Sequence, residues 1–119
     1  MKICILGANG NMGRRYQAIL NRELCVFDAF DIGDHFPNPN DYSHIILTTP
    51  TNLHLSHLSQ IDAMADKPVN ILCEKPIYKI DTPEKREEFY KILGRLEKNG
   101  HKLNMVNQYA YYSNGIKGS

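Results

Sequence analysis

A glycine-rich turn near the N-terminus constrains the fold more than any other feature of the sequence. The largely apolar run Lys2–Leu6 is typical of a strand covered on both faces, and it stops where the turn begins. Apolar residues then recur at helical spacing from Met12 to Asn21. A glycine motif placed between a strand and a helix is the context in which such a turn can hold a phosphate. The turn consists of Gly7, Ala8, Asn9, Gly10, Asn11, Met12 and Gly13.

The remaining chain alternates short apolar runs with helical segments. Further strands are predicted at Leu24–Phe27, His44–Leu47, Val69–Cys73 and Leu103–Val106. Helices are predicted where Leu55, Leu58, Ile61 and Ala65 share one face, and between an N-cap at Thr82 and a stop at Asn99-Gly100. Strands that alternate with helices form βαβ units. We therefore expect an α/β fold, a Rossmann-type doubly wound parallel sheet, in a single dinucleotide-binding domain over residues 1–119.

The segment between Asp28 and Tyr42 breaks this alternation, because its Gly, Pro, Asn and Asp residues favour turns. A parallel crossover needs about a dozen residues, so the segment can connect two strands but cannot also supply a full covering helix. We expect a minimal version of the fold that lacks the helix between strands two and three. One flank of the sheet is then thinly covered, by Phe30, Ile32 and Phe36.

Composition excludes several other classes of protein. The net charge is +1 and no basic block is present, so neither nucleic acid nor an anionic membrane is an expected partner. The N-terminal apolar run is too short for a signal peptide or a membrane span. Cys4, Cys25 and Cys73 are far apart, which favours buried thiols in a reducing, cytoplasmic compartment. No metal site is expected, because His54 and His57 lack a third ligand at suitable spacing.

The glycine turn and the following strand predict a dinucleotide site. Gly10 and Gly13 meet the needs for bare backbone and close helix packing, although Ala8 stands where the usual fingerprint has its first glycine. The helix that starts near Asn11 directs its amides at the phosphates. A turn without any ligand is the alternative.

Asp28 is expected to end the second strand and to accept the ribose hydroxyls of the adenosine half, or else to be a plain turn residue. A 2′-phosphate there would meet the charges of Asp28, Asp31 and Asp34, so NAD(H) is favoured over NADP(H). Arg14 and Arg15 argue the other way, since either could reach a 2′-phosphate.

Two more segments follow predicted strands at the same edge of the sheet. The first contains Thr48, Thr49, Pro50 and His54 and is assigned to cofactor binding, with the ring of His54 expected to bond neighbouring backbone. The second is Glu74-Lys75-Pro76. Lys75 could hydrogen-bond or protonate an oxygen at the reacting carbon, and is therefore the candidate catalytic residue. A solvated Glu–Lys pair in a loop is the alternative.

Taken in order, these motifs resemble the N-terminal NAD(P)-binding domain of the Gfo/Idh/MocA oxidoreductases over residues 1–109. The resemblance rests on Gly7–Gly13, on Asp28, on Thr49-Pro50-x-x-x-His54 and on Val69-x-Ile-Leu-Cys-Glu-Lys-Pro76. It implies that Glu74 contacts the nicotinamide-side ribose, that Lys75 lies beside the substrate, and that the substrate is a sugar, polyol or related compound. The second domain of that family, which supplies the substrate surface, is absent from these 119 residues. The turn alone also resembles that of dihydrodipicolinate reductase.

Three functions remain open at this point. The chain could be part of an oxidoreductase, or a minimal one completed by self-association. It could also be a non-catalytic NAD-binding module that regulates a partner, or a scaffold that has lost its ligand. The turn, Asp28 and Glu-Lys-Pro together disfavour the last of these. The thin flank and the tail Tyr109–Tyr112 favour a homodimer or a missing partner domain.

Overall fold

The computed structural model describes residues 2–75 and 81–107, with the backbone alone for Lys75, Val106 and Asn107. In chain order the elements are β1 (Ile3–Leu6), α1 (Asn11–Arg22), β2 (Phe27–Phe30), the 3₁₀ turn η1 (Pro39–Asp41), β3 (His44–Leu47), α2 (Thr51–Met64), β4 (Asn70–Lys75), α3 (Pro83–Lys98) and β5 (Lys102–Asn107). None of these helices combines the length and apolar character needed to cross a bilayer.

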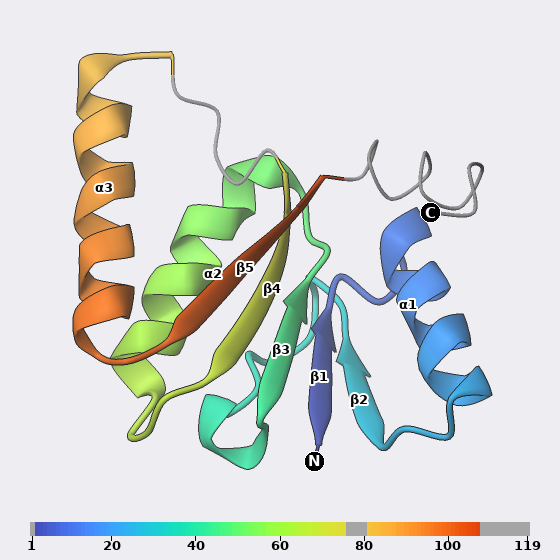
Figure 1. Cartoon of the computed structure of the whole chain (residues 1–119). Coiled ribbons are helices and arrows are strands. Elements are labelled where there is room, and N and C mark those ends of the chain that lie inside the picture. The colour runs from blue at the N-terminus through green and yellow to red at the C-terminus, as the bar shows by residue number, and fades with distance from the viewer. Residues whose placement is uncertain (1, 76–80, 108–119) are drawn as a thin grey trace.

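The five strands form one parallel sheet in the order β2-β1-β3-β4-β5. The chain moves outward from β1 to β2, returns past β1 to β3, and then continues in the opposite direction. Figure 1 shows the consequence, with α1 on one face of the sheet and α2 and α3 on the other. The predicted α/β Rossmann-type fold is confirmed. In such sheets the ligand crevice lies at the carboxyl ends of the strands where the direction reverses, which here is between β1 and β3.

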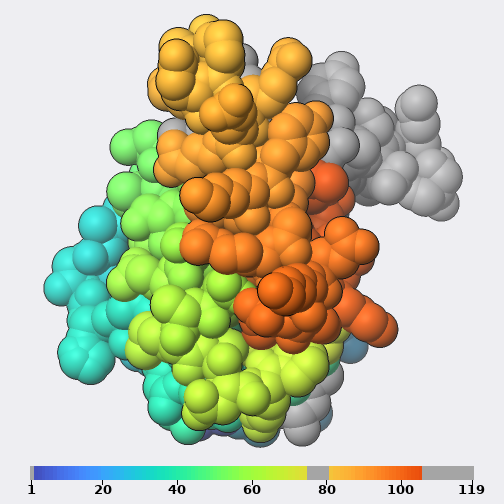
Figure 2. All heavy atoms as spheres, turned by 90° about the vertical axis from the view of Figure 1, so that its left-hand side faces the viewer, coloured from blue at the N-terminus to red at the C-terminus, as the bar shows by residue number. Residues whose placement is uncertain are grey.

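Alternate strand residues supply a core on each face of the sheet. The larger core joins Cys4, Ile45 and Ile71 to the apolar stripes of α2 and α3. Figure 2 shows α3, in orange, over much of that side, with α2, in green, next to it. The smaller core contains Ile3 and Ile5 and packs beneath α1. Burial of one such side chain contributes about 1.5–3 kcal/mol to stability, so these two cores hold the helices on the sheet.

The structure confirms the start and the end that the sequence predicted for α3. Thr82 caps α3, since its side chain accepts a hydrogen bond from the Lys85 amide at 3.2 Å. Gly100, with φ of +82°, follows the C-cap of the same helix. A glycine at this position ends a helix without the steric cost that a side chain would bring.

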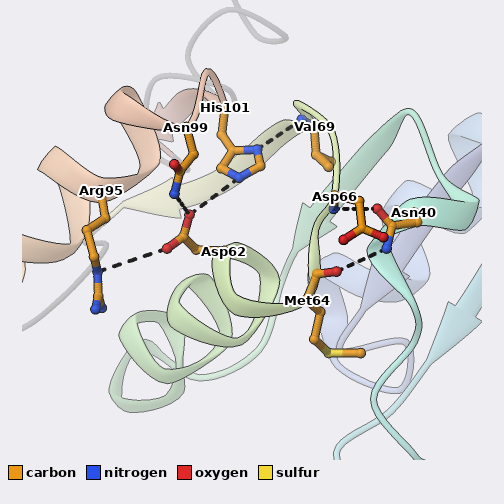
Figure 3. Close-up of polar contacts among 8 residues, drawn as sticks. All are labelled: Asn40, Asp62, Met64, Asp66, Val69, Arg95, Asn99 and His101. Atoms are coloured by element: carbon orange, nitrogen blue, oxygen red, sulfur yellow. Dashed lines mark hydrogen bonds and ion pairs between the residues drawn. The ribbon is translucent and has the colours of Figure 1, made fainter.

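The connection from β2 to β3 contains no α-helix, as predicted, and only the short turn η1 interrupts it. The Asn40 side chain fixes this connection to the end of α2: Nδ2 donates to the Met64 carbonyl at 3.0 Å, and Oδ1 accepts from the Asp66 amide at 2.7 Å (Figure 3). Phe30 and Phe36 pack against the larger core. The expectation for Ile32 was wrong, because its side chain is 58% exposed.

A second polar cluster joins the C-terminal ends of α2 and α3. The Asp62 carboxylate accepts a hydrogen bond from Asn99 Nδ2 at 2.6 Å, and Figure 3 shows it facing Arg95 and His101 as well. His101 Nδ1 accepts from the Val69 amide at 3.0 Å. The ring hydrogen of neutral His101 is therefore on Nε2, which lies 3.5 Å from Asp62 Oδ1.

The second strand begins at Phe27 rather than ending there, which corrects the sequence prediction. The amides of Leu24 and Cys25 close the end of α1 by donating to the Asn21 and Leu20 carbonyls. This is a Schellman motif, and it places Leu24 in the left-handed region at φ of 56° with 90% of its surface exposed. The apolar run that was interpreted as a strand is thus mostly a helix end.

Asp28 consequently lies inside β2, in register with Cys4, and does not end the strand. Its carboxylate accepts a hydrogen bond from Tyr42 Oη at 2.7 Å and pairs with Lys2 Nζ at 3.2 Å. The Tyr42 hydrogen bond and then the Lys2 contact hold the pKa of Asp28 below its usual value. Asp28 therefore belongs to a structural cluster near the start of β1, and the prediction that it meets a ribose at the strand's end was wrong.

Candidate functional site

The three glycines of the first turn have different reasons to be glycine. Gly7 has φ of +96°, and a Cβ there would lie 2.6 Å from Thr48 Oγ1. A Cβ on Gly13 would overlap the Gly7 carbonyl oxygen, so its absence lets α1 pack against the turn. Gly10 has φ of −77°, and a Cβ would meet only the Gly7 oxygen at 3.5 Å, an ordinary contact. The fold therefore explains Gly7 and Gly13 but does not require a glycine at position 10.

The N-terminus of α1 is directed at this turn. Gly10 is the N-cap, and as a glycine it has no side chain with which to cap the helix. Asn9, Gly10 and Asn11 are exposed, whereas Ala8 lies beneath them with 9% of its surface exposed. Gln17, from the second turn of α1, stabilises the glycine turn, since its Nε2 donates a hydrogen bond to the Ala8 carbonyl at 2.9 Å. An uncapped, exposed helix N-terminus with its positive dipole end is suited to an anion such as a diphosphate.

Asp31, not Asp28, is the carboxylate at the carboxyl end of β2. Both of its oxygens accept hydrogen bonds from Asn9 of the glycine turn, Oδ2 from Nδ2 at 2.9 Å and Oδ1 from the backbone amide at 3.4 Å. The Phe30 carbonyl accepts the amides of Gly7 and Ala8, at 2.8 and 3.0 Å, which aligns this strand end with the turn. The strand reads Phe-Asp-Ala-Phe, without a regular polar–apolar alternation, so no pattern within it distinguishes Asp31 from Asp28 as the acidic residue at its end.

The turn between β3 and α2 borders the glycine turn. Thr48 Oγ1 lies 2.7 Å from the Leu6 carbonyl oxygen and 3.2 Å from the Gly7 carbonyl oxygen, and its hydroxyl can donate to either. Pro50 is the N-cap of α2, and its side chain makes no capping hydrogen bond. Thr48, Thr49 and Pro50 therefore stand at the switch point between β1 and β3, as predicted, and a second helix N-terminus faces the same edge.

His54 lies inside the core rather than at the crevice, with 2% of its surface exposed. Its Nε2 is 2.6 Å from the Thr49 carbonyl, which confirms the expected bond to neighbouring backbone. Its Nδ1 is 3.4 Å from Cys73 Sγ. Burial, and then the Glu74 charge, raise the pKa of Cys73 to about 12, so the thiol stays protonated and donates to Nδ1. The prediction that His54 contacts a cofactor is therefore corrected, because this ring holds the turn to β4.

His57 extends this network to the crevice. Its Nδ1 lies 3.0 Å from Thr49 Oγ1, and its ring packs against Phe36 with centroids 5.6 Å apart. Burial first, and the neighbouring His54 second, lower the pKa of His57. His57 and Phe36 line a small hollow at the ends of β1, β2 and β3, which is also lined by Gly7 and Asp31. Within the described ranges 2–75 and 81–107, no group of three or more His, Cys, Asp and Glu side chains could hold a metal.

Glu74 is the polar side chain at the carboxyl end of β4, and one of its oxygens, Oε1, is buried. No hydrogen-bond donor among the described residues reaches Oε1. Burial raises the pKa of Glu74, and the positive charge of Arg15 partly opposes that rise. Lys75 is the last residue of β4, but its side chain and Pro76 lie outside the described residues. The structure thus provides an acceptor at this end of the crevice, and the role of Lys75 stays a prediction.

Arg15 acts electrostatically on the Glu74 end of the crevice. Its charge acts on Glu74, at the end of β4. β2 and β4 are three strand spacings apart in the sheet order, which is roughly 14 Å. This separation weakens the argument that Arg15 receives a 2′-phosphate beside Asp31. Arg14 is exposed on the first turn of α1.

The fold and this edge define a Rossmann-type α/β domain with a candidate nucleotide crevice. Among solved structures, the chain is similar to a protein assigned as an oxidoreductase, YvaA from Bacillus subtilis, with 19% identity and a TM-score of 0.64. It is also similar to the UDP-N-acetylglucosamine 3-dehydrogenase GnnA from Acidithiobacillus ferrooxidans, with 18% identity and a TM-score of 0.64. These matches cover 87% and 88% of this chain but only 34% and 38% of the other two.

The likeness to these two proteins is therefore one of fold, and it extends over little more than a third of their length. A scan against protein-family models and a search of curated protein sequences found no match to this chain.

Proposed function

We propose that this chain is the coenzyme-binding domain of an oxidoreductase and that it binds NAD(H) in preference to NADP(H). The observation that carries the proposal is Gly10. Its missing side chain serves no purpose in the fold, yet it leaves the backbone bare at the exposed, uncapped N-terminus of α1. A diphosphate needs a close approach to the backbone at the positive end of a helix, and both are present at this position.

The rest of the crevice fits a dinucleotide on both sides of that turn. On the β2 side, Asp31 offers carboxylate oxygens to ribose hydroxyls, and Asp34 adds a second negative charge that disfavours a 2′-phosphate. On the β4 side, the buried Oε1 of Glu74 has no donor among the residues that the structure describes, and a hydroxyl of the nicotinamide-side ribose would supply one. The coenzyme supplies hydride chemistry when it is bound.

We propose that Lys75 interacts with the reacting oxygen of the substrate and exchanges a proton with it. It ends β4 directly after Glu74, at the edge of the sheet where ligands of such folds bind. An ammonium there can donate a hydrogen bond or a proton to a carbonyl or alkoxide oxygen. The resemblance stated above and the sugar-nucleotide dehydrogenase among the structural neighbours favour a sugar, polyol or related substrate.

Turnover requires a second wall over the crevice to orient the substrate and exclude water. The chain spans only about a third of the length of the oxidoreductases it matches in structure, and we propose that a partner domain or a second copy provides this wall. A non-catalytic NAD-binding module is the second candidate. The two differ in one observable: only the first, in the presence of its partner, transfers hydride from NADH to a carbonyl derivative of a sugar or from a polyol to NAD⁺.

The glycine at position 10 gives the sharpest test of coenzyme binding. Gly10→Ala adds a single methyl group that the unliganded fold accommodates, so the midpoint of thermal unfolding should change little. NADH affinity, measured by titrating NADH fluorescence, should fall at least about tenfold because the methyl group occupies the diphosphate's approach.

Gly94→Ala is the matched control. This residue lies in α3 with no atom within 4 Å of the added Cβ, so the change should stabilise the helix by about 0.5–1 kcal/mol and leave NADH affinity unaltered. Equal NADH affinity in wild type and Gly10→Ala would contradict the proposed diphosphate site.

A further inference from the structure

The carboxylate of Asp31 is held by a residue of the glycine turn and not by its own strand. Asn9 donates to it twice, from Nδ2 to Oδ2 at 2.9 Å and from its backbone amide to Oδ1 at 3.4 Å. The Asp31 amide is bonded in turn to Asp34 Oδ2 at 2.8 Å, and the Asp34 amide donates to the Asp31 carbonyl at 3.0 Å. Backbone and side chain of Asp31 are therefore both fixed from outside β2.

The number of acceptor sites that remain on Asp31 matches a ribose. An ionised carboxylate has about four lone-pair positions, two on each oxygen. Asn9 occupies one position on each oxygen, which leaves one acceptor on each. The 2′- and 3′-hydroxyls of a ribose are two adjacent donors that can use these two acceptors. A 2′-phosphate offers one donor fewer and brings a charge of nearly −2 toward Asp31 and Asp34.

We propose that Asn9 is a specificity-determining positioning residue, which locks the Asp31 carboxylate in the orientation that accepts a ribose diol and rejects a 2′-phosphate. The inference rests on the proposed function, since it concerns how that crevice distinguishes two coenzymes. It also links the two halves of the site, because the residue that orients the ribose acceptor belongs to the turn proposed to hold the diphosphate.

The removal of the Asn9 side chain leaves Asp31 with its charge but without the side-chain donor that orients it. The carboxylate can then rotate into solvent, where it binds the diol less well and repels a 2′-phosphate less strongly. In Asn9→Ala, NADH affinity should therefore fall about 5- to 10-fold, the loss expected for one side-chain hydrogen bond. NADPH affinity should change less than about twofold or improve, so the ratio of the two affinities falls.

A double-mutant cycle separates this role from a purely structural one. NADH and NADPH affinities are measured by fluorescence titration on wild type, Asn9→Ala, Asp31→Ala and the double variant, with thermal unfolding recorded for each. Asn21→Ala is the control, an exposed asparagine at the far end of α1 that should alter neither affinity. We expect Asn9→Ala to have no further effect once Asp31 is alanine, because Asn9 acts through that carboxylate.

Three results would each overturn the inference while leaving the proposed function intact. The first is that Asn9→Ala weakens NADH and NADPH binding equally. The second is that its cost persists in the Asp31→Ala background, and the third is that Asn9→Ala alters neither affinity. Failure of the wild-type chain to bind NADH is a different result, since it overturns the proposed function itself.

Discussion

Substitution of Glu74 by glutamine should stabilise the protein and weaken coenzyme binding at the same time. In the unliganded chain, Oε1 of Glu74 is buried with no donor from the described residues, and burial raises the pKa of the carboxyl. Glutamine keeps an oxygen acceptor at this position, so the gain comes from removal of the partly desolvated negative charge, for which the desolvation cost is about 1–3 kcal/mol or more. Because Glu74 is only half-buried and the Arg15 charge opposes the effect, we take the lower end of this range. Glu74→Gln should then gain about 1 kcal/mol at pH 7, or roughly 4 °C in the unfolding midpoint.

The pH dependence of that gain identifies its cause. The pKa of Glu74 is raised by folding, so between the unfolded and folded pKa values the folded chain holds more protons. The contribution of Glu74 to stability is therefore fully present below the unfolded pKa and is lost as the pH rises through the folded value. The advantage of glutamine should thus be largest at pH 7 and should disappear near pH 4, where the carboxyl is protonated in both states.

The assays are urea unfolding at pH 7 and pH 4, and NADH titration at pH 7. Loss of a charged hydrogen-bond acceptor should weaken NADH about 10-fold or more. Glu88→Gln, at an exposed position of α3, serves as the control and should change neither stability nor affinity. A Glu74→Gln variant that is less stable than wild type at pH 7, or that gains equally at both pH values, would refute the reasoning.

Three further predictions follow from individual residues. Leu24→Gly should stabilise the protein by about 1 kcal/mol, because φ of 56° disfavours any side chain; Leu24→Ala keeps that cost, and a thermal melt that gives both variants the same gain would refute this reading. Asn40→Ala should cost about 2 kcal/mol in urea unfolding, since Met64 and Asp66 each lose a hydrogen bond; a loss below about 0.5 kcal/mol would contradict the proposed tie between loop and helix. Lys75→Ala should retain NADH affinity and abolish turnover in the assembled enzyme, so unchanged turnover would remove Lys75 from the chemistry.

The sequence predicted the parts of this fold that depend on local chemistry. Glycines at a strand–helix junction, threonine and proline at the start of α3, and an Asn-Gly stop act over a few residues, and each lies where it was expected. The missing helix between β2 and β3 was also predictable, because the number and type of the intervening residues decide it. For the same reasons, the backbone part of the candidate site could be located without a structure.

The parts that could not be predicted depend on contacts between distant segments. β2 begins later in the chain than the sequence predicted, because Leu24 adopts a left-handed conformation at the end of α1. Its residue type disfavours that conformation, so no sequence pattern indicated it. As a result, the acidic residue at the carboxyl end of β2 is Asp31 and not Asp28. Likewise, only the packing of α2 against β4 reveals that His54 points at Cys73 and not at the crevice. Side-chain direction on a helix follows from its tertiary partners, and spacing alone does not give it.

The most direct test of coenzyme binding is an amide-resolved NMR titration of the ¹⁵N-labelled 119-residue chain with NADH. We predict saturable shifts of the amides of Gly10, Asn11 and Gly13, with further shifts at Asp31 and Glu74 and none at the opposite end of the sheet around Asp62. An unchanged spectrum at millimolar NADH, or shifts that leave the glycine turn unaffected, would contradict the account.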